Sequence, residues 1–86
     1  MAQLSIVYFA WVREMIGQDE EHIDRPASGT TLADLIASLA ERGGGYAEAL
    51  ADPSRLRAAL DQHFVPLDTP IGEAVELAIF PPVTGG

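Results

Sequence analysis

The chain has 86 residues, of which 48% are hydrophobic and 21% are charged. This composition is typical of one folded domain with a single modest core and excludes a disordered chain. The formal net charge is −8, from 13 acidic residues and five arginines with no lysine. Because nucleic-acid binding depends on clustered basic side chains, we expect no nucleic-acid partner, and a basic protein partner fits better.

Cysteine is absent, which excludes disulfides, thiolate metal sites and a cysteine nucleophile. Residues 1–14 lack a basic leader with a small-residue cleavage site, and charges interrupt their apolar run. We therefore expect neither a signal peptide nor a membrane span, and a cytoplasmic location.

The first predicted element is a strand over residues 4–12, which are rich in Ile, Val and aromatic side chains. Side chains alternate along a strand, so it has two distinct faces. Leu4, Ile6 and Tyr8 share one face, and Ser5, Val7 and Phe9 share the other. Gly17 marks a turn, and a second, more exposed strand is expected over residues 20–24, closed by Pro26.

Residues 31–45 carry the clearest pattern in the chain, "TLADLIASLAERGGG". The apolar residues follow the spacing of one helical face and predict an amphipathic helix. Thr31 is placed to cap the first turn, with Asp34 three residues later as a shortened capping box. The glycine triplet at 43–45 is expected to end the helix. The apolar face comprises Leu32, Leu35, Ile36, Leu39 and Ala40.

The second half of the chain adds one short helical turn at residues 46–50, before Asp52 and Pro53 break the pattern. Residues 55–65 fit either a helix or a strand, and the alternation of Leu56, Ala58 and Leu60 favours a strand. Residues 74–80 alternate Val75, Leu77 and Ile79 against Glu76, Ala78 and Phe80, which indicates a half-buried strand. The order strand, strand, helix, strand, strand predicts an α+β roll with the helix packed on one face of the sheet.

Residues 1–80 contain no catalytic spacing. His22 and His63 are isolated, so we expect no metal site. The acidic run at 19–21 lacks the glycine and spaced ligands of a calcium loop, and a solvated face is the expectation.

The last six residues, 81–86, carry the strongest functional signal. Pro81 and Pro82 favour a semi-rigid extended arm, which reaches roughly 20 Å. Gly85 and Gly86 make its end the narrowest chain that L-amino acids allow, able to enter a tunnel. The carboxylate of Gly86 becomes an acyl donor or a sulfur carrier once another enzyme adenylates it. A frayed, inert end is the competing interpretation.

Three motifs carry a family resemblance: "FPPVTGG" at residues 80–86, "FAWVRE" at 9–14 and "ALDQ" at 59–62. With them the chain resembles the MoaD/ThiS family of ubiquitin-like sulfur carriers, which includes the small subunits of molybdopterin synthase, over nearly its whole length. The resemblance implies a β-grasp domain over residues 1–80, with the first and last strands parallel in the sheet centre, and an arm over 81–86. Asp61 stands where the family usually has Asn, and residues 72–74 replace the usual Gly-Asp-Glu turn.

The resemblance also implies a mechanism. A ubiquitin-activating-type enzyme (MoeB-like) uses ATP to adenylate Gly86, and sulfur then replaces one oxygen to give a thiocarboxylate. The arm inserts into the large subunit (MoaE-like) of a heterotetramer and donates sulfur to cyclic pyranopterin monophosphate, in molybdenum cofactor biosynthesis. The chain itself binds no cofactor and is not catalytic alone. The inserted residues are Pro81, Pro82, Val83, Thr84 and Gly85.

Aromatic residues predict a docking patch beside the arm. If the other strand faces pack under the helix, Phe9 and Phe80 lie together on the opposite face, near the root of the arm. The resemblance adds Phe64 as an apolar interface position. Cover by a local loop is the alternative.

Three other functions remain open for the sequence alone. They are a thiazole-pathway sulfur carrier, whose tails usually lack the full terminal motif, a ubiquitin-like modifier that forms isopeptide bonds through Gly86, and an interaction domain with an inert tail.

Overall fold

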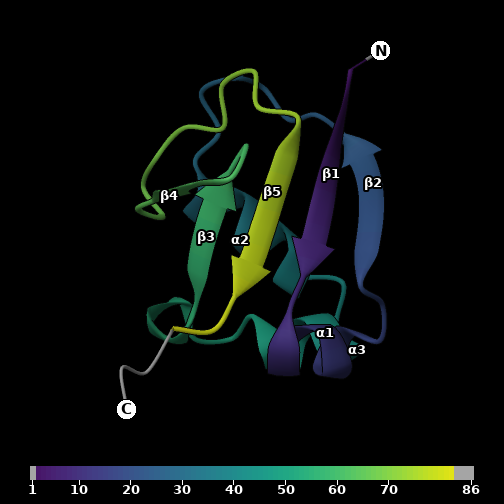
Figure 1. The fold of residues 1–86 in the computed structure, drawn as a ribbon. Helices are drawn as coiled ribbons and strands as arrows, with labels where there is room; N and C mark the ends of the chain where they lie inside the picture. Colours follow the sequence, from purple (N-terminus) through teal and green to yellow (C-terminus); the bar gives the residue numbers. More distant parts are fainter. Residues whose placement is uncertain (1, 83–86) are drawn as a thin grey trace.

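The computed structural model describes residues 2–82 and contains one five-stranded mixed sheet in the order β2-β1-β5-β3-β4. In the centre β1 and β5 pair in parallel, as expected, and the other neighbours pair antiparallel (Figure 1). The elements are β1 Gln3–Tyr8, α1 Ala10–Ile16, β2 Glu20–Asp24, α2 Leu32–Ala40, α3 Gly44–Ala49, the 3-10 helix η1 Pro53–Arg55, β3 Arg57–Leu60, β4 His63–Val65 and β5 Glu76–Phe80.

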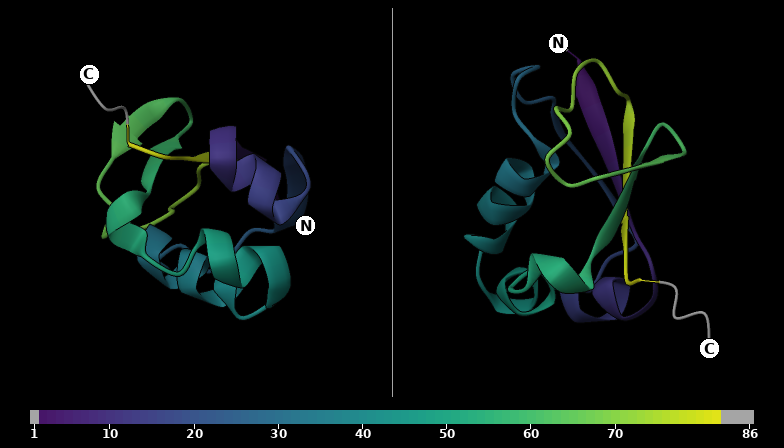
Figure 2. Two further views of the ribbon diagram at one scale, coloured as in Figure 1. Left: turned by 90° about the horizontal axis from the view of Figure 1, so that it is seen from below. Right: turned by 90° about the vertical axis from the view of Figure 1, so that its left-hand side faces the viewer.

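The core lies between α2 and one face of the sheet (Figure 2). The alternation predicted for β1 is confirmed, because its three core-facing side chains are at most 1% exposed. The predicted cap of α2 is confirmed too, since Asp34 N donates to Thr31 Oγ1 at 3.1 Å and Thr31 N donates to the Asp34 carboxylate. Sheet and helix meet through Leu4, Ile6, Tyr8, Leu77 and Ile79 on the strands and Leu32, Leu35, Ile36 and Leu39 on α2.

The strand predicted over residues 4–12 is wrong beyond Tyr8. Phe9 is the N-cap of α1, a helix that the sequence interpretation missed. Val12 is fully buried, and Ile16 packs against the core one turn later. This burial stabilises a helix in a segment whose residues have strand propensity. The signal for this helix in the sequence was the i, i+4 spacing of these two apolar residues, followed by a glycine; Gly17 ends the helix at φ 91°.

The glycine triplet does not end α2, which finishes earlier, at Ala40. Gly43 instead precedes α3, the helical turn expected near residue 46, and α3 already begins at Gly44. A side chain at Gly45 would overlap the backbone carbonyl of Met15 on α1. Glycine is therefore required here by the close approach of α1 and α3.

The single strand expected within residues 55–65 is a hairpin of two strands. Leu60 pairs with His63, and Asp61 and Gln62 between them have φ values of 49° and 72°. These left-handed values fit the two-residue turns that match strand twist. The structure therefore contains three elements that the sequence did not predict: the helix α1 before β2, the 3-10 helix η1 before β3, and the strand β4 after β3.

The carboxylate of Asp61 ties this hairpin to the beginning of β5. Asp61 Oδ1 accepts from Val75 N and Glu76 N, both at 3.0 Å, and Asp61 N donates to Glu76 O at 2.9 Å. Val75 thus lies before the strand and is 62% exposed, so its predicted place on the core face is wrong.

A polar cluster joins the other end of the core. Glu21 of β2 accepts from the hydroxyls of Tyr8 and Tyr46 at 2.7 Å each and from Arg42 Nη1 at 2.8 Å. Burial alone would raise the pKa of Glu21, but these three hydrogen bonds outweigh it and hold the pKa below its ordinary value. Glu21 thus links β1, β2 and α3, and the fold stabilises its ionised carboxylate.

Replacing Gly45 by Ala should destabilise the protein by about 1–3 kcal/mol, because the new methyl group collides with backbone rather than with a movable side chain. Gly29→Ala is the matched control, since nothing lies within 4 Å of its added Cβ. Urea unfolding of both variants measures the difference. Equal stabilities would contradict the close approach of the two helices.

Glu21→Gln should lower the thermal midpoint at pH 7, with a difference from wild type that shrinks as the pH falls below 4.5. The folded pKa lies below the ordinary value of 4.5, so the charge stabilises the fold above that pH and its contribution is lost on acidification. Glu14→Gln on the exposed side of α1 serves as control. A loss that is the same at pH 3 and pH 7 would contradict this role.

Candidate functional site

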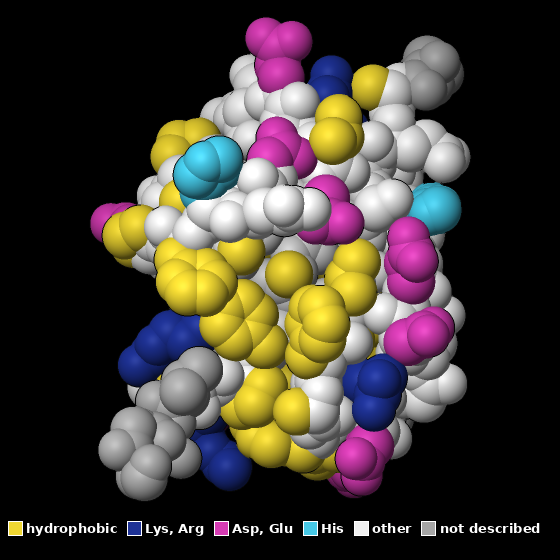
Figure 3. Space-filling view, viewed as in Figure 1, with side chains coloured by type: hydrophobic (Ala, Val, Ile, Leu, Met, Phe, Trp, Pro, Cys, Tyr) yellow, Lys and Arg dark blue, Asp and Glu magenta, His cyan; other side chains and the backbone are white. Residues whose placement is uncertain are grey.

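Three phenylalanines gather on the sheet face opposite α2, and we call Phe9, Phe64 and Phe80 the phenylalanine face. Phe64 is 80% exposed and Phe9 46% exposed, while Phe80 is half-buried. The Phe64 and Phe80 ring centroids lie 5.5 Å apart. Figure 3 views this side of the molecule, where hydrophobic side chains form a continuous patch over the strands. An apolar patch of this kind indicates a binding surface.

Strand register explains why the rings meet. Phe80 follows the buried Ile79 on β5 and so points to the open side of the sheet. Ala59 on β3 pairs with Phe64 and with Ala78, and it is only 4% exposed although it faces away from the core. The small side chain of Ala59 thus forms the floor of a shallow hollow. Its lining is Phe9, Ala59, Gln62, Phe64, Glu76, Ala78 and Phe80.

The chain leaves the sheet directly beside this face. Phe9 N donates to Ile79 O at 3.2 Å, so the end of β1 is bonded to the end of β5. Pro81 and Pro82 follow β5 and are half-buried. The predicted arm residues Val83, Thr84, Gly85 and Gly86 lie outside the described residues.

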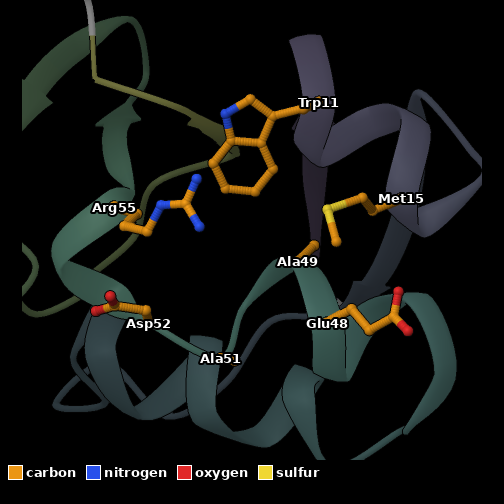
Figure 4. A pocket seen from close by; sticks show the side chains of 7 residues that line it. All are labelled: Trp11, Met15, Glu48, Ala49, Ala51, Asp52 and Arg55. Atoms are coloured by element: carbon orange, nitrogen blue, oxygen red, sulfur yellow. The ribbon is translucent and has the colours of Figure 1, made fainter.

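A second hollow, of about 320 Å³, lies between α1, α3 and η1 (Figure 4). The Arg55 guanidinium carbon lies 5.1 Å from the Trp11 ring centroid, a cation–π contact that joins η1 to α1. Asp52 caps η1 by accepting from Ser54 N at 3.1 Å. The Ser54 hydroxyl also donates to Asp52 Oδ1, at 2.6 Å, and together these contacts anchor η1. The lining is Trp11, Met15, Glu48, Ala49, Ala51, Asp52 and Arg55.

The two histidines lie on opposite edges of the sheet. His22 on β2 has its Nε2 3.3 Å from Glu20 Oε2, and His63 on β4 has its Nδ1 3.1 Å from Asp61 O. Within residues 2–82, no group of three or more metal-ligating side chains is close enough to hold an ion. In that same part of the chain no helix is long and apolar enough to span a bilayer.

The sequence interpretation missed two residues of the site, Ala59 and Arg57. Register pairs Arg57 with Phe80, so its side chain shares the open side of the sheet. The alternation that put Ala58 in the core already implied this placement for both neighbours. Their place in the site depends on the β3–β4 hairpin, which brings Phe64 beside them and which the sequence did not predict.

Comparison with known proteins decides the family. Residues 6–86 match the ThiS family. The chain belongs to this family. As a ThiS family member it is 37% identical over 83 residues to the molybdopterin synthase sulfur carrier subunit of Escherichia coli, a match that covers 96% of this chain and 99% of that protein. The corresponding subunit of Mycobacterium tuberculosis is 28% identical over the full length of both chains.

Solved structures agree on the fold. A Pyrococcus furiosus protein described as a molybdopterin converting factor subunit 1 superposes with a TM-score of 0.73 at 25% identity, covering 96% of this chain and all of that one. SAMP1 from Haloferax volcanii gives a TM-score of 0.69 at 21% identity, covering 99% of this chain and all of that one, which shows the shared fold alone. The ThiS family member therefore has the β-grasp, ubiquitin-like fold expected for it.

Phe64→Ala should change the free energy of unfolding by no more than about 0.5 kcal/mol, because an exposed side chain contributes little to the core. Leu77→Ala on β5 is the contrasting variant. It removes a fully buried side chain and should cost about 2–5 kcal/mol. Urea unfolding measures both, and a large loss for Phe64→Ala would show that the phenylalanine face is part of the core.

Proposed function

We propose that this chain is the sulfur-carrier subunit of a molybdopterin synthase and carries sulfur as a thiocarboxylate on Gly86. The observation that carries the proposal is the match to molybdopterin synthase sulfur carrier subunits over nearly the full length of both proteins, at 37% identity in the Escherichia coli case. The family match extends to residue 86, the terminal glycine.

The described residues support a carrier whose docking surface and reactive end work together. Leu77 and Ile79 fix β5 in the core, and the alternate position Phe80 faces outward beside Phe64. The arm at residues 81–86 continues from that same strand end. A partner that binds the phenylalanine face therefore lies where the arm begins, and this favours delivery of Gly86 into the partner's own site.

The proposed chemistry begins with activation by a ubiquitin-activating-type enzyme (MoeB-like). A Gly86 carboxylate oxygen attacks the α-phosphorus of ATP, pyrophosphate leaves, and an acyl-adenylate forms. A sulfur nucleophile at the oxidation level of sulfide attacks the acyl carbon and AMP leaves, which gives the thiocarboxylate. ATP is used by the partner, so the chain needs no cofactor of its own.

The second partner in the proposal is the large subunit (MoaE-like). Pro81 and Pro82 direct the arm, and the small Gly85 lets its end pass a narrow entrance. Sulfur is transferred from Gly86 to cyclic pyranopterin monophosphate, and water restores the carboxylate. The small subunit is the sulfur donor, while the large subunit supplies the catalytic site.

Co-expression with the activating enzyme and a sulfur donor should give an intact mass shifted by one oxygen-to-sulfur exchange, which deletion of Gly86 abolishes. The deletion should also abolish molybdopterin formation with the large subunit, whereas Gly29→Ala leaves it normal. Normal product formation by the deletion variant would overturn the proposal. Conjugation of Gly86 to lysines of other proteins without any sulfur exchange would instead identify a modifier.

A further inference from the structure

The phenylalanine face carries opposite charges at its two ends. Along β5, Glu76 and Phe80 share the open side of the sheet with Ala78 between them. Arg57 on β3 pairs with Phe80 and marks the end of the face where the arm begins. Four residues along β5 separate the two ends, or about 13 Å.

Arg57 is held in place without being neutralised. Its Nη1 donates to Leu56 O at 2.8 Å and to Ser54 O at 3.3 Å, and both acceptors are uncharged carbonyls. Among residues 2–82 the ion pairs are His22 with Glu20 and Arg42 with Glu21, neither of which involves Arg57. A guanidinium that is held in position and has no charged partner can bind a carboxylate of a partner protein at a low cost in conformational entropy.

Three other arginines make side-chain contacts away from the phenylalanine face. Arg42 is paired with Glu21, Arg55 stacks on Trp11, and Arg25 donates to Glu73 O at 3.1 Å. Among these, Arg57 is the cation that lies beside Phe64 and Phe80, in a separate hollow next to the one floored by Ala59.

Glu76 provides the negative end. The Asp61 carboxylate holds its backbone nitrogen at 3.0 Å, so the position of this residue is fixed. Its half-buried side chain lines the hollow floored by Ala59, together with Phe9 and Phe64, and no ion pair in the described part of the chain includes it.

We propose that the partner docking on the phenylalanine face presents an acidic side chain to Arg57 and a basic side chain to Glu76, and that this pair of charges sets its orientation along β5. The inference rests on the proposed function, in which this partner is the large subunit. Apolar ring contacts are non-directional, whereas charges at the rim fix register and penalise the reversed arrangement. Only one orientation along β5 brings the partner's site to the end where the arm begins.

The test measures binding of three full-length variants to the large subunit by calorimetry: Arg57→Glu, Glu76→Arg and the double exchange R57E/E76R. Each single reversal should weaken binding about three- to tenfold at low salt, and the double exchange at least as much. The double exchange keeps the net charge of the wild type, so its loss can only reflect the local charge pattern. High salt should reduce all three losses.

Arg25→Glu is the matched control, because it changes the net charge as Arg57→Glu does but lies after β2, where its backbone nitrogen donates to Ala2 O. It should bind like the wild type. Thermal unfolding checks that each variant folds, and Arg57→Gln and Glu76→Gln replace any that do not, with losses of about two- to fivefold expected.

Wild-type affinity for R57E/E76R, or equal losses for Arg57→Glu and Arg25→Glu, would overturn the proposal. If Phe64→Ala abolishes binding while the charge variants bind normally, the docking face and the proposed function stand and the orienting charges are wrong. If Phe64→Ala also binds normally, both the docking face and the inference are wrong. If the charge variants alter only self-association of the free chain, measured by sedimentation, the surface joins copies of this chain and the inference is wrong.

Discussion

The parallel pairing of β1 with β5 is the constraint on which the other features depend. Ile6 stands beside Leu77, and Tyr8 beside Ile79, in the centre of the sheet. Because side chains alternate, burying these residues under α2 obliges Phe9 and Phe80 to face the other way. Parallel strands also finish at the same end of the sheet, so both phenylalanines lie where the chain leaves for the arm. Core packing and the position of the candidate site are thus consequences of one pairing.

Polar side chains then fix the parts that hydrophobic burial leaves undefined. Asp61 holds the start of β5 against the hairpin turn through three hydrogen bonds of its carboxylate and backbone. Glu21 does the same for β2 and α3 through two tyrosines and Arg42. These contacts are directional, so they determine register where apolar packing alone would tolerate a shift. A sheet whose register is fixed by such contacts presents the three rings already side by side, which favours affinity.

The sequence predicted the features that depend on local pattern. Residues close together in the sequence determine the capping box at Thr31, the apolar face of α2 and the alternation of β1 and β5. The helix α1 was missed because the strand propensity of Trp11 and Val12 is local, whereas its stability comes from contacts across the core. Strand β4 has three residues and exists through its pairing with β3, so no pattern of its own marks it. The grouping of Phe64 with Phe80 depends on that pairing and was available only from the family resemblance.

The central claim is that sulfur on Gly86 moves from this chain to a pterin substrate, and an isotope-transfer experiment tests it most directly. The chain is loaded with heavy sulfur at its C terminus, purified, and mixed with the large subunit and cyclic pyranopterin monophosphate in a single turnover. The account predicts that the label disappears from the chain and appears in the dithiolene of the product at the same rate. Label that stays on the chain while unlabelled product forms would contradict it.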